Sequence, residues 1–485
     1  EHHGFGKYHT PEGQVAYEGN LVVGKRHGRG KEFHDDGSLF YDGEWQHDAQ
    51  QGSGTLYHPN ELPYLEGMFH KGILNGSGKE YDEQGMLAYQ GGFKDGTRHG
   101  SGEVFTPKGV LAFAGEFRDG TIHGQGTEYQ GDGTPLYKGQ WQDGKRHGKG
   151  ILFYSSISTS SNEVPLYKGE FANGQRQGQG QEFRKDGSLY YEGGWQEDLR
   201  HGEGQAFSPS GNTAYEGGFR YGQREGFGRK FRDDGSPYYE GEWSANKKHG
   251  AGKVFFPDGV VAFEGEFQDN ERHGHGQEFR KDGSLYFEGE WTNGERSGSG
   301  KLFASDGRVT FEGKLINGSG SGREFRADGS LLYDGTWENQ RWHGSVALYF
   351  PNGNLAYQGN FQDAKRHGSG KQFREDGSLL YEGQWEQDQR QGSGKLLTPT
   401  GEVAYEGGFR EGRRHGLGSE YLQGGTLYYT GNWIADQRHG SGKQFREDGS
   451  LLYDGTWENQ HWHGSGALYF PNGNLAYQGN FQDAK

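Results

Sequence analysis

Histidine is the residue whose type and spacing first suggest chemistry in this sequence. It stands directly before a glycine at His27, His99, His123, His147, His201, His249, His273, His343, His367, His415, His439 and His463. Imidazole is a common zinc ligand, but these histidines are mostly 24 residues apart. If each belongs to its own hairpin, the rings lie about 10 Å apart, too far to share one ion. Glutamine also takes this place, at Gln51, Gln177 and Gln391. The pattern therefore predicts a role in the turn and no metal site.

Other motifs that could bind or react are equally repetitive. The segment GSGK at 298–301 lacks the Gly-x4-Gly-Lys-Ser/Thr spacing of a phosphate-binding loop. The Asp-Gly pairs lack the spacing of an EF-hand loop. Carboxylates recur in every repeat, no Ser/His pair stands apart, and the chain has no cysteine. We therefore expect no catalytic residue, no cofactor and no enzymatic activity.

Aromatic rings on a polar chain are the strongest candidates for a binding surface. The sequence has 11 Trp, 29 Tyr and 31 Phe residues, although only 29% of its residues are hydrophobic. Rings that recur on one face can form a core, or they can bind a partner or a second copy of the chain. The candidate binding residues are Trp141, Trp195, Trp243, Trp291, Trp337, Trp385, Trp433, Tyr191, Tyr239, Tyr381 and Phe373.

A short repeated motif positions these rings. An aromatic residue is followed by glycine two residues later and by a second aromatic residue four residues later, as in Tyr381, Gly383 and Trp385. Twenty starts occur, nearly all 24 residues apart, with leucine in place of the first aromatic residue at Leu65 and of the second at Leu21 and Leu315. In a β-strand, residues i, i+2 and i+4 point to one face. A unit so rich in glycine does not sustain a helix. Each motif therefore predicts a strand with its rings on one face.

The regular spacing also predicts the domain organisation. We expect an N-terminal edge at 1–16 and one continuous array of about 20 repeats at 17–485. One interval is 30 residues long and contains a serine-rich loop insertion at 155–162.

The geometry of the turns determines which other residues lie on the same face of the sheet as the rings. Segments such as 375–377 suit a three-residue loop, a type I turn followed by glycine in the left-handed region. With this loop, Phe373 pairs with Leu379 and is predicted to share a face with Tyr381 and Trp385.

The predicted fold is all-β. Tandem β-hairpins of about 24 residues form an elongated, twisted antiparallel meander, and the alternative is a parallel β-solenoid with one coil per repeat. One layer cannot bury its apolar face alone. The rings must therefore be covered by a second copy, by the curl of the same sheet, or by a partner peptide.

The segment YEGEWSANKKHGAGKVFFPDG at 239–259 resembles a MORN (membrane occupation and recognition nexus) repeat. The shared pattern is Tyr-x-Gly-x-Trp/Phe, a few polar residues, His-Gly-x-Gly, an aromatic strand and a turn, and it covers 17–485. The resemblance implies single-layer β-hairpin arrays that act as scaffolds, dimerise, or contact proteins and in some cases membranes. This chain departs from the family in its acidity and in having no attached catalytic domain.

These observations favour a non-enzymatic structural protein that assembles into a filament, fibre or end-joined oligomer. The partners expected are other copies of the chain and, in addition, other proteins. The net charge of −16 disfavours nucleic acid and argues against an anionic membrane surface. The alternatives are a MORN-like protein scaffold, and a binder of lipid headgroups or carbohydrates through the aromatic face. The fibre hypothesis favours an extracellular or cell-surface location over a cytoplasmic one.

Overall fold

The computed structural model describes residues 3–155, 163–316 and 319–484. Forty β-strands and no helix occur among these residues, so no helix there could cross a membrane. The predicted serine-rich insertion at 155–162 lies outside the described residues, apart from Ser155. The chain divides into two compact units, which are described one at a time.

The first unit, Glu1–Lys247, contains the first twenty strands in full. These are β1 (Gly4–His9), β2 (Val15–Val22), β3 (Lys25–Phe33), β4 (Leu39–Gln46), β5 (Ala49–Tyr57), β6 (Pro63–His70), β7 (Ile73–Tyr81), β8 (Leu87–Lys94), β9 (Thr97–Phe105), β10 (Leu111–Arg118), β11 (Thr121–Tyr129), β12 (Pro135–Gln142), β13 (Lys145–Phe153), β14 (Pro165–Ala172), β15 (Gln175–Phe183), β16 (Leu189–Gln196), β17 (Leu199–Phe207), β18 (Thr213–Arg220), β19 (Gln223–Phe231) and β20 (Pro237–Ser244).

The second unit, Lys248–Lys485, contains the other strands, the first of which begins one residue earlier. These are β21 (Lys247–Phe255), β22 (Val261–Gln268), β23 (Glu271–Phe279), β24 (Leu285–Thr292), β25 (Glu295–Phe303), β26 (Val309–Ile316), β27 (Ser319–Phe325), β28 (Leu331–Glu338), β29 (Arg341–Tyr349), β30 (Leu355–Gln362), β31 (Lys365–Phe373), β32 (Leu379–Glu386), β33 (Gln389–Leu397), β34 (Val403–Arg410), β35 (Arg413–Tyr421), β36 (Leu427–Ile434), β37 (Gln437–Phe445), β38 (Leu451–Glu458), β39 (His461–Tyr469) and β40 (Leu475–Ala484).

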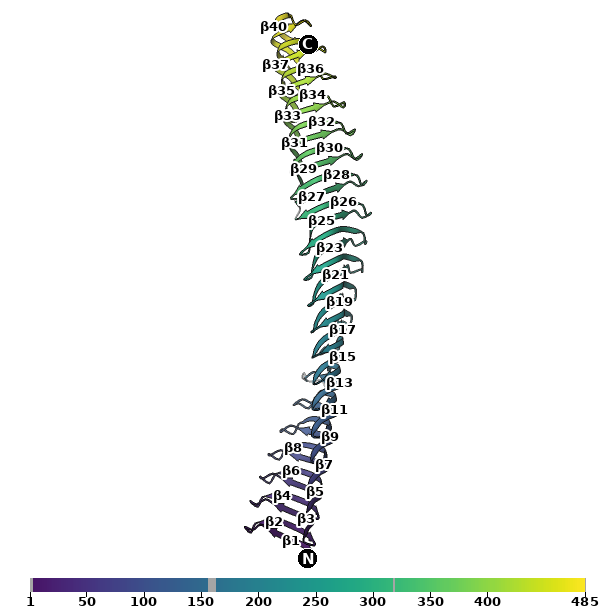
Figure 1. Ribbon diagram of the computed structural model, residues 1–485, viewed down its shortest axis with the longest axis vertical. Helices are drawn as coiled ribbons and strands as arrows, with labels where there is room; N and C mark the ends of the chain where they lie inside the picture. The colour runs from purple at the N-terminus through teal and green to yellow at the C-terminus, as the bar shows by residue number, and fades with distance from the viewer. Residues whose placement is uncertain (1–2, 156–162, 317–318, 485) are drawn as a thin grey trace. The chain divides into compact units, whose positions relative to one another are not determined.

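Within each unit, every strand pairs antiparallel with the next strand in sequence (Figure 1). The predicted antiparallel hairpin meander is confirmed. The parallel β-solenoid alternative is wrong, because tight turns reverse the chain after each strand and leave no room for a crossover.

The Asp-Gly turns have the predicted three-residue loop. At 375–377, the Gly377 N–H donates to the Arg374 carbonyl at 2.9 Å, and the Arg374 N–H donates to the Ser378 carbonyl at 2.9 Å. Gly377 has φ +85°, a conformation that glycine adopts at little cost. This is the expected type I turn followed by a glycine bulge.

A second kind of turn was not predicted. Gln387 and Asp388 connect β32 to β33, and both have positive φ, 49° and 69°. Two such residues form a type I′ turn, which matches the twist of the strands on either side. The Asp388 carboxylate accepts the Arg366 N–H at 2.9 Å, so the preceding hairpin helps to fix the turn. Glutamine rarely adopts positive φ, so this turn could not be predicted from its residue types.

Each repeat packs one ring across two glycines. The Tyr381 side chain is 0% exposed and lies over Gly383 and Gly394, where any Cβ atom would overlap its hydroxyl group. The Tyr381 ring meets Trp385 edge-to-face at 5.2 Å, and it meets Phe409 of the next repeat at the same centroid distance. The Tyr381 hydroxyl and the Trp385 indole N–H each donate to a backbone carbonyl. The rings therefore link neighbouring repeats, and glycine leaves the space beneath them that they fill.

Two almost identical repeats show what happens when glycine is replaced. One has Val346 where the other has Gly466. In the first, Trp337 is tilted by 52° against its tyrosine and is only partly buried. In the second, the angle is 87° and Trp457 is 4% exposed. A side chain beneath the ring thus displaces the neighbouring tryptophan.

The predicted position of Phe373 was wrong. Phe373 does pair with Leu379, but the register shifts immediately afterwards and Tyr381 pairs with Gln372 instead. One extra residue reverses the facing of a side chain, so the bulge removes Phe373 from the ring face. An equivalent residue, Tyr81, hydrogen-bonds to the Glu66 carboxylate on the polar face. The rings sixteen residues after each start therefore lie off the ring face, and one of them, Phe153, is nevertheless buried, at 7% exposed.

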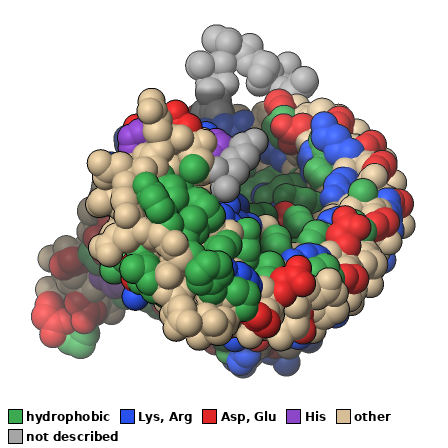
Figure 2. All heavy atoms as spheres, turned by 90° about the horizontal axis from the view of Figure 1, so that it is seen from above, with side chains coloured by type: hydrophobic (Ala, Val, Ile, Leu, Met, Phe, Trp, Pro, Cys, Tyr) green, Lys and Arg blue, Asp and Glu red, His purple; other side chains and the backbone are tan. Residues whose placement is uncertain are grey.

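Within each unit, the sheet itself covers the ring face, since the rings are buried in the single chain. Figure 2 shows hydrophobic side chains gathered within a hollow, with acidic and basic side chains around its outside. We call the face that carries Tyr381 and Trp385 the inner face, and the face that carries Glu382 the outer face. The curl of the same sheet was one of the three covers considered from the sequence.

The ring packing predicts different tolerance on the two faces. Replacing Gly383 with Val places Cβ 2.6 Å from the Gly394 Cα, a backbone atom that cannot turn aside, and overlaps Tyr381. We expect Gly383→Val to lower the free energy of unfolding by about 1–3 kcal/mol. The matched control Glu382→Val loses only an exposed ion pair with Lys371, worth about 0–1 kcal/mol. Urea unfolding measures both, and equal losses would contradict the face assignment.

Candidate functional site

The structure places most of the predicted binding residues in the core. Ten of the eleven lie on the inner face, and nine of those are 0–8% exposed: Trp141, Trp195, Trp243, Trp291, Trp385, Trp433, Tyr191, Tyr239 and Tyr381. Trp337 is partly buried, as is Phe373 on the outer face. Their role in self-association or partner binding stays a prediction, and in this structure few of them are accessible to a partner.

Arginines line the inner face, although they were not among the residues predicted for it. The guanidinium carbon of Arg366 lies 4.0 Å from the centre of the Trp385 ring, within the range of a cation–π interaction. The same contact recurs at 4.0–4.7 Å for Arg26 on Trp45, Arg176 on Trp195, Arg224 on Trp243, Arg272 on Trp291 and Arg414 on Trp433. An arginine nine residues after many motif starts was the signal in the sequence.

The repeated histidines face the turns of the following repeat. His99 Nδ1 lies 3.7 Å from the Asp119 carboxylate. Where glutamine replaces histidine, Gln177 accepts the Glu197 N–H at 3.2 Å and Gln391 accepts the Glu411 N–H at 3.1 Å. An amide thus fills the same place by holding a turn. No group of three potential metal ligands occurs among residues 3–155, 163–316 and 319–484.

Exposed ion pairs run along the outer face. A basic residue near the end of one strand faces an acidic residue of the adjacent strand, as in Lys371 and Glu382 at 3.0 Å. The same arrangement recurs for Lys31 with Asp42, Arg229 with Glu240, Lys253 with Glu264, Lys301 with Glu312, Lys395 with Glu406 and Lys443 with Asp454. Each side chain is about half exposed, so each pair contributes about 0–1 kcal/mol.

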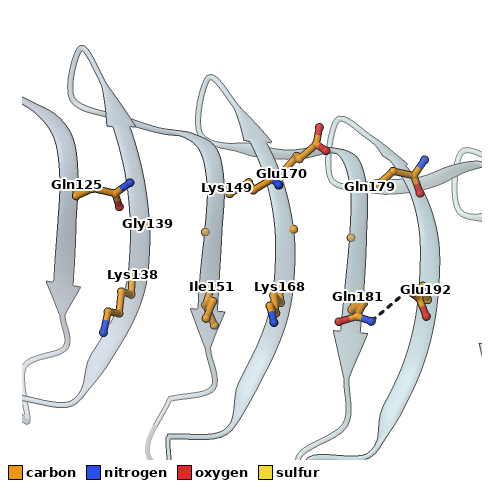
Figure 3. Close-up of a pocket in the computed structure, with 13 residues that line it drawn as sticks. Gln125, Lys138, Gly139, Lys149, Ile151, Lys168, Glu170, Gln179, Gln181 and Glu192 are labelled. Carbon is orange, nitrogen blue, oxygen red and sulfur yellow. Dashed lines mark hydrogen bonds between the residues drawn. The ribbon is translucent and has the colours of Figure 1, made fainter.

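The pattern of charge reverses around a shallow hollow in the first unit (Figure 3). Lys138 and Lys168 each directly follow a motif start, which is the position that Glu382 has in its own repeat. Their strands place Ile151 directly between them in the register, and Lys149 also lines the hollow. The volume is about 540 Å³.

The floor of this hollow consists of glycines on β12 to β15. None of the lysines at positions 138, 149 and 168 makes an ion pair with any residue that the structure describes. Two carboxylates also line the hollow, Glu170 and Glu192, and Glu192 accepts a hydrogen bond from Gln181 at 3.1 Å. The hollow is thus a cationic site with an apolar centre.

Hairpins that repeat every 24 residues and bury one ring over glycines define a tandem β-hairpin repeat protein. The sequence matches the family model described as MORN repeat over 17–39, 41–61, 66–86, 89–109, 113–134, 137–156, 167–189, 191–213, 215–236, 239–261, 263–285, 287–308, 357–379, 381–403, 405–426 and 429–451. A MORN repeat variant model matches 342–363 and 462–483. The chain belongs to the MORN repeat family.

The other comparisons with known proteins do not narrow the function further. No curated protein matches the sequence. The crystal structure of TcdB2-TccC3-Cdc42 is 10% identical, with 96% of this chain and 28% of that chain covered and a TM-score of 0.15. The Tc holotoxin pore of Photorhabdus luminescens is also 10% identical, with 96% and 26% covered and a TM-score of 0.16. This chain therefore spans less than a third of the length of those proteins.

A smaller protein covers a different share of the chain. The TCP10 domain of Danio rerio CPAP, solved in complex with a peptide of Danio rerio STIL, is 11% identical. The alignment covers 62% of this chain and 98% of that chain, with a TM-score of 0.15. Similarities this low support no inference about function.

Burial raises the pKa of the core tyrosines. The pKa of Tyr381 rises from its ordinary value of 10.0 to about 12, since ionisation would place a charge inside the ring core. Burial raises the pKa to the same value for Tyr17, Tyr89, Tyr137, Tyr191, Tyr357 and Tyr405.

This shift predicts alkaline unfolding. Unfolded tyrosines ionise near pH 10, whereas the folded chain retains these protons to about pH 12. The contribution to stability is therefore complete below pH 10 and is lost as the pH rises towards 12. We expect tyrosinate absorbance and loss of the β-sheet circular dichroism signal to rise together. Ionisation of most tyrosines near pH 10 with an unchanged sheet signal would contradict the buried core.

Proposed function

We propose that this chain is a non-enzymatic structural repeat protein that binds protein partners through its outer face. The observation that supports this best is the division between the two faces. The inner rings and glycines recur with little change, and their surfaces are buried by packing against one another. The residue after each motif start lies on the outer face and varies, from Glu382 to Lys138, Ala114 and Thr430. The outer face therefore carries what distinguishes one repeat from another.

The cationic hollow around Ile151 is the contact position that we propose, and its occupant is an acidic segment of a partner protein. Lys138 and Lys168 lie two strand spacings apart, about 10 Å. A peptide in the polyproline II conformation has three residues per turn and rises about 3.1 Å per residue, so its residues i and i+3 lie on one side about 9 Å apart. A sequence Glu-x-x-Glu in this conformation thus matches the two lysines that flank Ile151. Opposite charge gives such contacts their orientation and specificity.

Self-association into a filament or end-joined oligomer is a second proposal, and it rests on the sequence pattern alone. Because the rings are buried, it would use other surfaces of the chain. The extracellular or cell-surface location belongs to this fibre hypothesis. Light scattering at increasing protein concentration tests it, and a chain that stays monomeric would contradict it. Sugar stacking and lipid binding through the aromatic face need exposed rings, whereas nine of the predicted binding residues are 0–8% exposed.

The docking proposal predicts binding of a defined probe. The probe is a fluorescent peptide with a Glu-Leu-Leu-Glu centre, followed by fluorescence anisotropy with the full chain. We expect the double variant Lys138→Glu/Lys168→Glu to bind about tenfold more weakly, because two exposed attractions become repulsions. Added salt should weaken binding to the unaltered chain.

The matched control is Lys371→Glu/Lys395→Glu, which makes the same change of charge on the outer face where the lysines are already paired. Equal loss of binding in both variants would mean that only net charge matters and would contradict a defined site. Binding to anionic lipid vesicles without binding to the peptide would also contradict the proposal.

A further inference from the structure

A second regular row of charges lies on the inner face of the first unit. In alternate repeats, the residue fifteen positions after the motif start is glutamate, and it pairs with an arginine nine positions after a start. The pairs are Glu32 with Arg26 at 2.7 Å, Glu80 with Arg98 at 2.8 Å, Glu128 with Arg146 at 2.7 Å and Glu182 with Arg200 at 2.6 Å. All eight side chains are about one-fifth to one-third exposed. Each of these four arginines thus has an acidic neighbour.

The fifth member of this row is reversed in charge. Lys230 stands fifteen residues after the start at Tyr215, where Glu182 stands fifteen residues after the start at Tyr167. Arg224 occupies the arginine position of the same repeat, as Arg176 does beside Glu182. Two cations therefore face each other where the regular row has a cation and an anion.

The surroundings do not neutralise this pair. The Arg224 guanidinium carbon lies 4.0 Å from the centre of the Trp243 ring, and Arg224 donates to the Asn246 carbonyl at 3.0 Å. The Lys230 ammonium lies 5.2 Å from the centre of the Tyr238 ring. Neither cation has an ion pair with any residue in the described part of the chain. Arg224 also donates from Nε to the Asn246 side-chain oxygen at 3.4 Å, and none of these ring, carbonyl and amide contacts carries a formal negative charge.

The titration behaviour agrees with an uncompensated pair. Burial lowers the pKa of Arg224, and the neighbouring Tyr215 offsets only part of that effect. Burial also lowers the pKa of Lys230, and the charge on Arg224 lowers it further. By contrast, the Glu182 carboxylate raises the pKa of Arg200 in the regular row.

We propose that Arg224 and Lys230 bind one small oxyanion, a carboxylate or phosphate group in the place that Glu182 occupies in its own repeat. Two partly buried like charges repel each other, and a bound anion converts that repulsion into two attractions. Arginine offers a planar fork that matches either group, and lysine adds a compact charge. The ring faces beside both cations exclude water from one side and strengthen the attraction. This inference is independent of the proposed docking on the outer face.

Titration calorimetry and thermal unfolding of the full chain test this site. Phosphate and acetate are the probes, each compared with chloride at equal ionic strength. We expect at least one of them to bind and to raise the melting temperature, because a ligand that binds only the folded state stabilises it. Phosphate alone would indicate a phosphate site, acetate alone a carboxylate site, and both a general oxyanion site.

The variant Lys230→Glu restores the regular pair and is expected to fold at least as stably as the unaltered chain. It should lose anion binding by about tenfold or more, since the site then carries its own carboxylate. Lys185→Glu, in an exposed turn of the same unit, makes the same change in net charge and should bind as before. Equal binding by Lys230→Glu, or no difference between either probe and chloride, would overturn the proposal.

Discussion

The packing of one aromatic ring across two glycines sets the geometry of this protein. Tyr381 lies over Gly383 and Gly394 and touches one ring in its own repeat and one in the next. Such edge-to-face pairs contribute about 0.5–1.5 kcal/mol each beyond the area they bury. Because the contact joins successive hairpins, stability accumulates along each unit as a sum of neighbour terms. The close approach also needs little side-chain volume beneath the rings, which glycine provides; where Val346 replaces it, the neighbouring Trp337 is displaced.

The sequence predicted the features that follow directly from periodicity. Spacing of two within Tyr381, Gly383 and Trp385 identified the strand and its buried face, and the Asp-Gly pair at 376–377 identified the loop. The family followed from the same pattern. These predictions succeed because neighbouring residues alone determine them, and the repeat presents the same neighbours about twenty times.

Other features depend on contacts that a linear pattern does not contain. A bulge next to Phe373 reverses the sheet face to which its side chain points. The strict alternation of side chains used for the prediction assumes that no such extra residue is present. The type I′ turn at Gln387 is held by Arg366 of the preceding strand, which is distant in sequence. The covering of the rings could have come from a second copy or a partner, and the curl of the sheet became visible only in three dimensions.

Burial of the rings changes where recognition takes place. Because ring packing fills the inner face, contacts with other molecules must use side chains that differ from the regular repeat pattern. The first unit contains two such departures, Lys138 with Lys168 on the outer face and Lys230 on the inner face. Each replaces an acidic residue of the regular pattern with a basic one. In a chain of net charge −16, such local reversals are the places where an acidic group is attracted rather than repelled.

The central claim is that each chain covers its own rings, and acrylamide quenching of tryptophan fluorescence tests it most directly. Eight tryptophans, including Trp385 and Trp433, are 1–8% exposed in the single chain. Covering by the same chain predicts strong protection from the quencher at every protein concentration, down to the most dilute sample that can be measured. Protection that disappears on dilution would show that a second copy supplies the cover and would contradict this account.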